Sequence, residues 1–387
     1  MQEETSKGCD ESRPVCLNCS KRHAECHYEG TSSLRWTNEE PSPARLSHKH
    51  DSTASQGGDS PSSTARSFGI LGQLGGPSDS PQAASSLNLS DLELMMQWCN
   101  STHQILARNE RVDPVWRTLV PKEALSHPFL MHGILALSAL HLARTHDDHR
   151  RPTYLSTAVA HQNQALAYFR ESLNDINASN AKAMFAFASV VAVYALGFPH
   201  PPDPKDPQTC LDDLLQVFNL SRGVQHVLAQ ATPSIKDTDW EIILHLDDYD
   251  TTILEEESSA LRRLQEVNDA CGAQDPHHDP SVYATALENL EDMTAGIHGG
   301  LTPITVACRW AIKMKASYVD AIREHNPLAL VILAHYLAIL HRSRPDWCVY
   351  DWTVTVPKAI WSILHDHWKP LAHWPMVVVY GENYQNK

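Results

Sequence analysis

The chain has 387 residues, of which 42% are hydrophobic, so it is long enough to bury a large core. Its 31 Lys and Arg residues face 46 Asp and Glu residues, and the formal net charge of −15 excludes a protein that coats nucleic acid with its whole surface. The longest apolar stretches, roughly 183–198 and 328–340, are shorter than the ~20 residues that a bilayer-spanning helix needs, which argues against a transmembrane protein.

Four of the nine cysteines lie in the first part of the chain, residues 1 to about 30. Because the opening residues contain no apolar run, we expect no secretory signal and reduced thiols. Cys9, Cys16, Cys19 and Cys26 are separated by six, two and six residues. A two-residue gap lets two thiolates wrap one ion in a tight turn, and soft sulfur ligands favour zinc. The spacing predicts a zinc site, and the alternative is four reduced thiols in a disordered tail.

Residues 31 to about 88 are dominated by Ser, Pro, Gly and Gln and contain few large apolar side chains. Such a segment cannot bury enough surface to offset the entropy of ordering it. We therefore expect a flexible, disordered linker over 31–88, between a zinc-binding segment at 1–30 and a large domain at 89–387.

From Leu89 onward, apolar residues recur at steps of three and four, which predicts an amphipathic helix to about residue 106. Ser90 and Asp91 are the candidates for its N-terminal cap. The residues on the stripe are Leu92, Met95, Met96, Cys99, His103 and Leu106.

The same period continues along the chain and predicts further helices at 129–143, 152–176, 181–196, 211–230, 303–323, 327–342 and 356–368. The proline-rich stretch 199–207 is predicted to be an extended loop, because prolines leave no continuous run of backbone donors. The charged stretch 255–280 is predicted to be an exposed excursion with a short helix at about 261–267. Since no run of alternating strands occurs, the large domain is predicted to be all-α.

An all-helical domain with several alanine-rich helices either packs solid or leaves an apolar cavity between helices. Large aromatic and methionine side chains are candidates for the lining of such a cavity, although stripes of this kind form core more often than pocket. The candidates are Met95, Trp98, Met131, Phe185, Phe187, Tyr194 and Trp310. No individual ligand-binding residue is predicted from this pattern.

The chain has 23 histidines, which raises the question of a helical metal-dependent enzyme. None of the histidines matches H-E-x-x-H, and no G-x-S-x-G elbow, P-loop or dinucleotide glycine pattern occurs. We therefore expect solvated histidines on loops or helix ends, and no catalytic centre. The tightest groupings are His146 with His149, His277 and His278 with Asp279, and His365 with His367.

The segment CDESRPVCLNCSKRHAEC, which begins at Cys9, resembles the fungal binuclear zinc cluster family of transcription factors. In that family six cysteines hold two zinc ions, and the third to sixth cysteines follow the spacing found here. The resemblance implies that Cys9, Cys16, Cys19 and Cys26 are the third to sixth zinc ligands. The family also carries a first C-x2-C and a basic run before its third cysteine, and that run enters the major groove of DNA.

Before Cys9 stand the eight residues MQEETSKG, with Lys7 as their sole base. By the family's ligand sharing, one zinc would keep two protein ligands and the other three, whereas a structural zinc normally has four. Lys7, Lys21 and Arg22 are the candidates for DNA contact, but acidic residues outnumber basic ones over 1–29. We expect DNA binding by this segment to be weak or lost. Either the sequence begins downstream of the true start, which we favour, or the protein is a shortened form.

From about residue 89 to about 375, blocks such as HPFLMHGILALSALHLA and NPLALVILAHYLAILHRSRPDW resemble, in order and spacing, the C-terminal regulatory domain of the fungal sterol-uptake-control regulators. The resemblance implies an all-helical ligand-sensing domain with a lipophilic effector such as a sterol. It also implies a nuclear regulator of RNA polymerase II transcription, with DNA and transcriptional coregulators as partners and sterol or lipid genes as candidate targets. The alternative is an interaction protein, deficient in DNA binding, that pairs with full-length relatives and titrates them.

Overall fold

The computed structural model describes residues 88–384, except 174, 200–205, 246–252 and 344–345. The predicted zinc-binding segment at 1–30 and the predicted linker, apart from Asn88, lie outside the described residues. The same holds for the predicted zinc ligands and the three predicted DNA contacts. The described residues form helices joined by turns, without a strand, which confirms the all-α prediction for this part of the chain. None of the described helices has the length and apolar character needed to cross a bilayer.

The N-terminal half of the described chain is built around one buried helix, α4 (Pro128–Thr145). Pro128 stands in its first turn, where a missing N–H does no harm, and buried residues then follow on all sides of the helix. The main contacts of α4 are with α5, α6 and α2. The other elements of this half are α2 (Leu89–Asn100), η2 (Thr102–Ile105), η3 (Val115–Leu119), α3 (Val120–Ala124), α5 (Arg151–Ser172) and α6 (Ala181–Gly197).

The ends of α2 differ from the prediction. The helix is capped by Asn88, whose side-chain oxygen accepts a hydrogen bond from the Asp91 N–H at 3.3 Å, so the assignment of the cap to Ser90 or Asp91 is wrong. The helix also stops before residue 106, because Ser101 leaves the helical conformation at φ −147°. Beside this end, the Trp98 indole N–H donates to the backbone carbonyl of Trp116 at 2.9 Å, which satisfies a buried donor.

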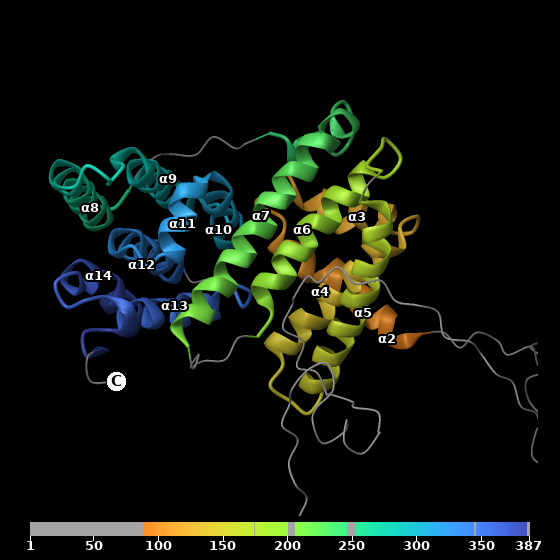
Figure 1. The fold of residues 1–387 in the computed structure, drawn as a ribbon. Coiled ribbons are helices and arrows are strands. Elements are labelled where there is room, and N and C mark those ends of the chain that lie inside the picture. The colour runs from red at the N-terminus through yellow and green to blue at the C-terminus, as the bar shows by residue number, and fades with distance from the viewer. Residues whose placement is uncertain (1–87, 174, 200–205, 246–252, 344–345, 385–387) are drawn as a thin grey trace, which may run out of the picture. The chain divides into compact units, whose positions relative to one another are not determined.

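Helix α7 (Pro207–Ile235) lies between the two halves (Figure 1). Its cap is Asp206, whose carboxylate accepts from the Gln208 N–H at 3.1 Å, and Pro207 occupies the first turn. The predicted helix 211–230 is confirmed and is extended at both ends. Helix α7 contacts α6 from the N-terminal half and α10 (Pro303–Lys313) and α13 (Tyr350–Ile363) from the C-terminal half.

The C-terminal half is built around α12 (Pro327–Arg342), in which every residue from Leu328 to Leu340 is buried. Its cap is Asn326, whose side-chain oxygen accepts from the N–H groups of Leu328 at 3.1 Å and Ala329 at 3.3 Å. Helix α12 contacts α14, α13, α9 and α11. The remaining elements are η4 (Glu241–Ile243), α8 (Glu255–Gln274), α9 (Pro280–His298), α11 (Ala316–Arg323) and α14 (Lys369–Tyr380).

The charged stretch 255–280 is not the exposed excursion that we expected. Helix α8 runs through 255–274 and packs against α9, which the sequence pattern did not predict. Leu261 and Leu264 of α8 are buried, and so is Glu257, which pairs with His298 of α9 at 2.7 Å. Charged side chains on the remaining faces of α8 obscured the helical period in the sequence.

Two other predicted helices have different boundaries. The predicted helix 303–323 is divided into α10 and α11 by an extended backbone at Met314 and Lys315. There Arg222 of α7 donates hydrogen bonds to the carbonyl of Met314 and, at 3.2 Å, to that of Ala311. These carbonyls, at the C-terminal end of α10, have no hydrogen-bond donor within the helix itself. The predicted helix 356–368 is replaced by α13, which ends at Ile363, and by α14, which was not predicted.

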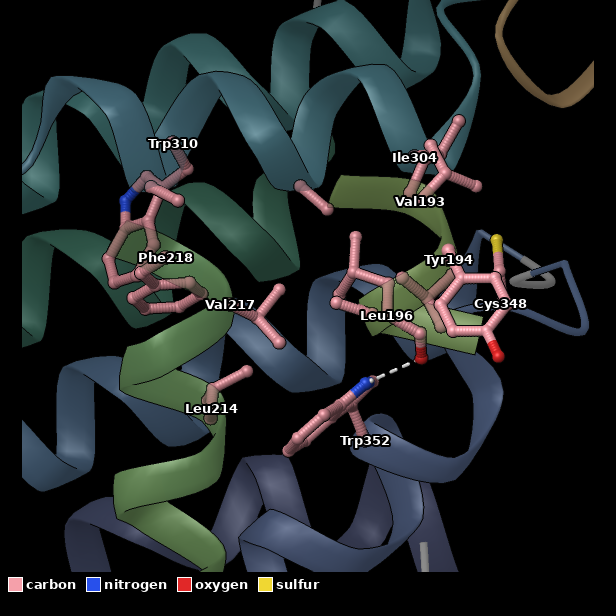
Figure 2. Close-up of a cluster of buried hydrophobic side chains, with 14 of the residues drawn as sticks. Val193, Tyr194, Leu196, Leu214, Val217, Phe218, Ile304, Trp310, Cys348 and Trp352 are labelled. Atoms are coloured by element: carbon pink, nitrogen blue, oxygen red, sulfur yellow. Dashed lines mark hydrogen bonds between the residues drawn. The ribbon is translucent and has the colours of Figure 1, made fainter. Parts of the chain in front are cut away.

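A cluster of buried side chains joins the two halves beside α7 (Figure 2). The Trp352 indole N–H of α13 donates to the carbonyl of Leu196, at the end of α6, at 2.8 Å. At Gly197 a side chain would collide with the ring of Trp347, so only glycine lets the end of α6 lie this close to Trp347. The two halves therefore share one core. The residues labelled in Figure 2 come from α6 (Val193, Tyr194, Leu196), α7 (Leu214, Val217, Phe218), α10 (Ile304, Trp310) and the α13 region (Cys348, Trp352).

Candidate ligand-binding cavity

A cavity of about 760 Å³ opens between α6, α7 and α10. This volume lies within the ~300–1,000 Å³ that is usual for pockets that hold small molecules. Residues in and after η2, Trp116 of η3, and Ile243 and Leu244 at η4 line its remaining sides. A second hollow, of about 320 Å³, is lined mainly by polar residues of the segment 104–113 and is much smaller. The larger cavity is therefore the candidate site.

Each long wall of the cavity is one face of a helix. Helix α7 contributes positions 221, 224, 225, 228, 229 and 232, and α10 contributes 304, 305, 308, 309, 312 and 313. Both series step by three and four residues, which is the spacing of one helix face. The third wall is Ser189, Ala192 and Val193 of α6. Small side chains, such as Ser189, Ala192 and Ala229, leave space between the helices that Leu or Phe would fill.

Three of the four hydroxyl groups on these walls are engaged within their own helices. Ser189 donates to the Phe185 carbonyl at 3.0 Å, and Thr232 of α7 donates to the Leu228 carbonyl at 2.8 Å. Ser221 likewise donates to a carbonyl one turn earlier in α7, at 3.1 Å. Because these three donors already have acceptors, they offer a ligand mainly apolar surface, and Gln225 and Thr305 are the other uncharged polar side chains of the walls.

The charged residues of the lining are all basic. They are Arg108, Arg309 and Lys313, and no Asp or Glu belongs to the described lining. The Arg108 guanidinium donates to backbone carbonyls at η4, including that of Ile242 at 2.9 Å. Arg309 and Lys313 both pair with Asp292 of α9, at 3.2 and 2.7 Å. The site therefore combines largely apolar walls with an edge that carries three basic side chains, two of them paired with Asp292.

Cys308 is the thiol on the α10 wall. Burial raises the pKa of Cys308 to about 11, partly offset by a hydrogen bond with Ser221. The thiol is therefore protonated at neutral pH. A protonated thiol, unlike a thiolate, is a poor nucleophile and a poor metal ligand. Cys308 acts here as a small apolar wall residue.

The seven aromatic and methionine residues offered as lining do not line the cavity. Trp98, Phe187 and Trp310 are buried, and Trp310 stacks on Tyr336 with ring centroids 4.2 Å apart. The cavity lies where small side chains face one another, because large rings fill space rather than leave it. The expectation that such stripes form core is confirmed for these rings, and the suggested lining is wrong. The other four of the seven, which also lie in or against the core, are Met95, Met131, Phe185 and Tyr194.

The histidine groupings do not assemble a centre in the described residues. His278 makes a hydrogen bond with Asn268 at 2.8 Å and stacks on Tyr283, and the rings of His365 and His367 stack on each other. Within the described ranges, no group of three or more His, Cys, Asp or Glu side chains is arranged to hold a metal ion. The predicted zinc ligands lie outside those ranges.

Residues 93–220 match the family model described as the fungal specific transcription factor domain. The matched range runs from α2 into α7 and includes the α6 wall of the cavity. Over these residues the chain is similar to fungal transcription factors. Members of this family are regulators rather than enzymes.

Three relatives are similar to parts of this chain. It is 36% identical over 126 residues to sterol uptake control protein 2 of Candida albicans, a match that covers 31% of this chain and 17% of the relative. The sterol uptake control protein 2 of Saccharomyces cerevisiae is 33% identical over 112 residues, or 29% of this chain and 12% of the relative. A Zn(2)-C6 fungal-type transcription factor of Gibberella zeae is 25% identical over 304 residues, or 70% of this chain and 59% of the relative. The match thus spans less than a fifth of both sterol uptake control proteins.

Proposed function

We propose that this fungal transcription factor regulates transcription in response to a lipophilic effector, which its helical domain binds in the cavity between α6, α7 and α10. The observation that carries the proposal is the make-up of the walls. Helix α6 belongs to the N-terminal half, α10 belongs to the C-terminal half, and α7 touches both. A ligand in this place would contact both halves at once.

Such a position suits a regulatory site. A ligand that fits one arrangement of the two halves better than another shifts the population toward that arrangement, by as much as its affinity differs between the two. Filling the cavity would add contacts between the α6 and α10 walls and so favour a closed arrangement. A changed surface could then alter coregulator contact or nuclear entry.

A sterol is our candidate for the effector, and sterol or lipid genes are the candidate targets. Two relatives carry the name sterol uptake control protein, and the apolar walls suit a largely hydrocarbon ligand.

The effector proposal is tested with the full chain and the neutral apolar dye Nile red, displaced by ergosterol. We expect Ala192→Phe, which fills the α6 wall, to weaken dye binding by at least about tenfold. The matched control is Ala273→Phe, because Ala273 lies on an exposed face of α8 and does not line the cavity. Equal dye affinity in both variants and the parent chain would contradict a ligand site in this cavity.

We also propose a zinc-binding segment at 1–30, a linker at 31–88 and the regulatory domain at 89–387, in a protein that acts in the nucleus. Relatives named as Zn(2)-C6 transcription factors support zinc as the cofactor. Cys9, Cys16, Cys19 and Cys26 would bind it, with Lys7, Lys21 and Arg22 as candidate contacts to DNA.

Native mass spectrometry of the full chain, purified from its own host, tests the zinc proposal. We expect bound zinc that is lost in Cys16→Ser and kept in Cys271→Ser, since Cys271 is a free thiol of α8. Zinc retained in both variants would contradict the predicted ligands. A zinc-dependent, salt-sensitive gel shift by the same protein would support DNA binding, and its absence would favour the alternative of a partner that titrates full-length relatives.

A further inference from the structure

Helix α10 is held by contacts on two sides. Toward α9, the Trp310 indole N–H donates to the Ala286 carbonyl at 3.3 Å. Toward α7, the Cys308 thiol forms a hydrogen bond with Ser221, and both of these residues line the cavity. Because α7 and α10 are two walls of the cavity, the contacts between these helices set how wide the cavity is.

The end of α10 is fastened to α7 by one side chain that lies outside the lining. Arg222 of α7 donates from Nε to the Ala311 carbonyl at 3.2 Å and from Nη2 to the Met314 carbonyl. Ile312 and Lys313 stand between these two carbonyls in the sequence, and both line the cavity. Arg222 therefore holds the stretch of α10 that ends this wall, although it does not itself belong to the lining.

The chemistry of arginine fits this contact. Its planar guanidinium presents several N–H groups in a fixed fork, so one side chain can serve two carbonyls, whereas lysine offers a single ammonium. Carbonyls at the C-terminal end of a helix lack donors within the helix and favour a cation. Burial is the main cause that lowers the pKa of Arg222, so its guanidinium is partly shielded from water. A charged donor that is shielded from water forms stronger hydrogen bonds.

We infer that Arg222 is a positioning residue of the ligand site, whose hydrogen bonds to the Ala311 and Met314 carbonyls hold the α10 wall at the distance from α7 that the ligand needs. This inference rests on the proposed function, because it names a residue that governs affinity at the same cavity without touching the ligand. Loss of these bonds frees the last turn of α10 and lets the cavity widen. A rigid ligand then loses contact with one wall, since a gap of about 1 Å already removes much of the dispersion attraction.

The variant Arg222→Met tests the inference, because methionine keeps much of the apolar stem of arginine and lacks its donors. Ergosterol binding to the full chain is measured by displacement of Nile red. We expect the affinity for ergosterol to fall by about tenfold in Arg222→Met and by about threefold in Arg222→Lys, which keeps a donor but not the fork. Arg262→Met is the matched control, since Arg262 pairs with Glu255 on the exposed face of α8 outside the cavity. An unchanged affinity in Arg222→Met would overturn the inference.

Hydrogen–deuterium exchange separates positioning of the wall from general stability. Without ligand, Arg222→Met should speed exchange of the amides at 310–316 by at least about fivefold and leave the amides of α4 as they are in the parent chain. Faster exchange in α4 to the same degree would mean a general loss of stability and would contradict the positioning role. If the parent chain bound neither Nile red nor ergosterol, the proposed function itself would fail, and this inference with it.

Discussion

The two halves of the helical domain are each built around one buried helix, but the helices packed beside those two differ in character. Helix α4 packs in an aromatic group of Phe129, Phe169 and Phe187, and Arg144 near its end pairs with Asp351 of α13 at 2.7 Å. Helix α12 is as thoroughly buried, yet its end is joined to α8 and α14 by polar groups. Glu256 of α8 accepts from Trp374 of α14 at 2.7 Å and from Arg342 of α12 at 2.9 Å.

These polar contacts change the pKa of the carboxyl group that they involve. The hydrogen bonds from Trp374 and Arg342 lower the pKa of Glu256. Its neighbour Glu257 is 2% exposed and is held by His298. The two central helices are thus equally buried, but α6 beside α4 has an apolar period in its sequence, whereas α8, which is joined to α12 through Arg342, carries mostly charged and polar residues.

The largest expected effect tests whether the two central helices are equally packed. Leu137 of α4 and Leu337 of α12 are both fully buried. We expect Leu137→Ala and Leu337→Ala each to lower the free energy of unfolding by about 2–5 kcal/mol, measured by urea denaturation. Leu92→Ala, on the exposed face of α2, is the control and should change it by less than about 0.5 kcal/mol. A much smaller loss of unfolding free energy at Leu337 than at Leu137 would show that the two central helices are not equally packed.

Each central helix also carries a buried neutral histidine. Burial lowers the pKa of His141 in α4 and of His335 in α12 from 6.5 to about 4. In the unfolded chain these histidines take up a proton first as the pH falls, so stability is intact above pH 6.5 and is lost as the pH falls toward 4. At about pH 5 each should contribute a loss of about 2 kcal/mol.

Unfolding free energies measured across this pH range, with His141→Gln and His335→Gln, check the expectation. Each variant should flatten the pH dependence by a similar amount, whereas His149→Gln, on the exposed surface, should leave it unchanged. If only one of the two variants flattened the pH dependence of the unfolding free energy, the acid sensitivity would lie in that half of the domain alone.

A smaller effect is expected from the buried acid of α8. Glu257→Gln should lower the free energy of unfolding by about 1–2 kcal/mol, because it weakens the hydrogen bond to His298. The counterpart in the N-terminal half is Asp113→Asn, which alters the pair with His103 at 3.0 Å. The Asp113 carboxylate is 30% exposed, so its change should cost less, about 0.5–1 kcal/mol. Equal losses in thermal and urea unfolding would remove the distinction between the halves.

The smallest effects should come from exposed ion pairs. Arg323→Gln removes a pair with Asp320 at 2.8 Å in the C-terminal half, and Arg151→Gln removes a pair with Asp147 at 3.9 Å in the N-terminal half. Solvent screens both pairs, so each change should be under about 0.5 kcal/mol in urea denaturation at physiological salt. A loss above 1 kcal/mol at either site would indicate a role in packing that its exposure does not suggest.

The helices that the sequence predicted and those that it missed differ in the same way, in how apolar their sequences are. Helices with a long apolar period, such as α4, α6 and α12, were predicted close to their bounds. Helices α9 and α14 were missed, and α8 was predicted as a short helix in an exposed excursion, because charged or aromatic residues interrupt the pattern. The break between α10 and α11 could not be predicted, since it depends on Arg222 reaching from another helix.

The candidate site was harder to predict than the fold. The sequence pattern drew attention to large rings, whereas the cavity lies beside small residues such as Ala192 and Ala229. The one signal in the sequence was the wealth of Ala in α6, which indicates either close helix approach or empty space between helices.

By itself, the sequence determined the all-α class and the core helices, since helical period and burial are local properties of a chain. It also contained the family signature, because block order is written in the chain itself. Only the tertiary structure decided where α6, α7 and α10 leave a cavity and which charges border it. A cavity is what remains between side chains that lie far apart in sequence, so no local pattern specifies its place or its edge.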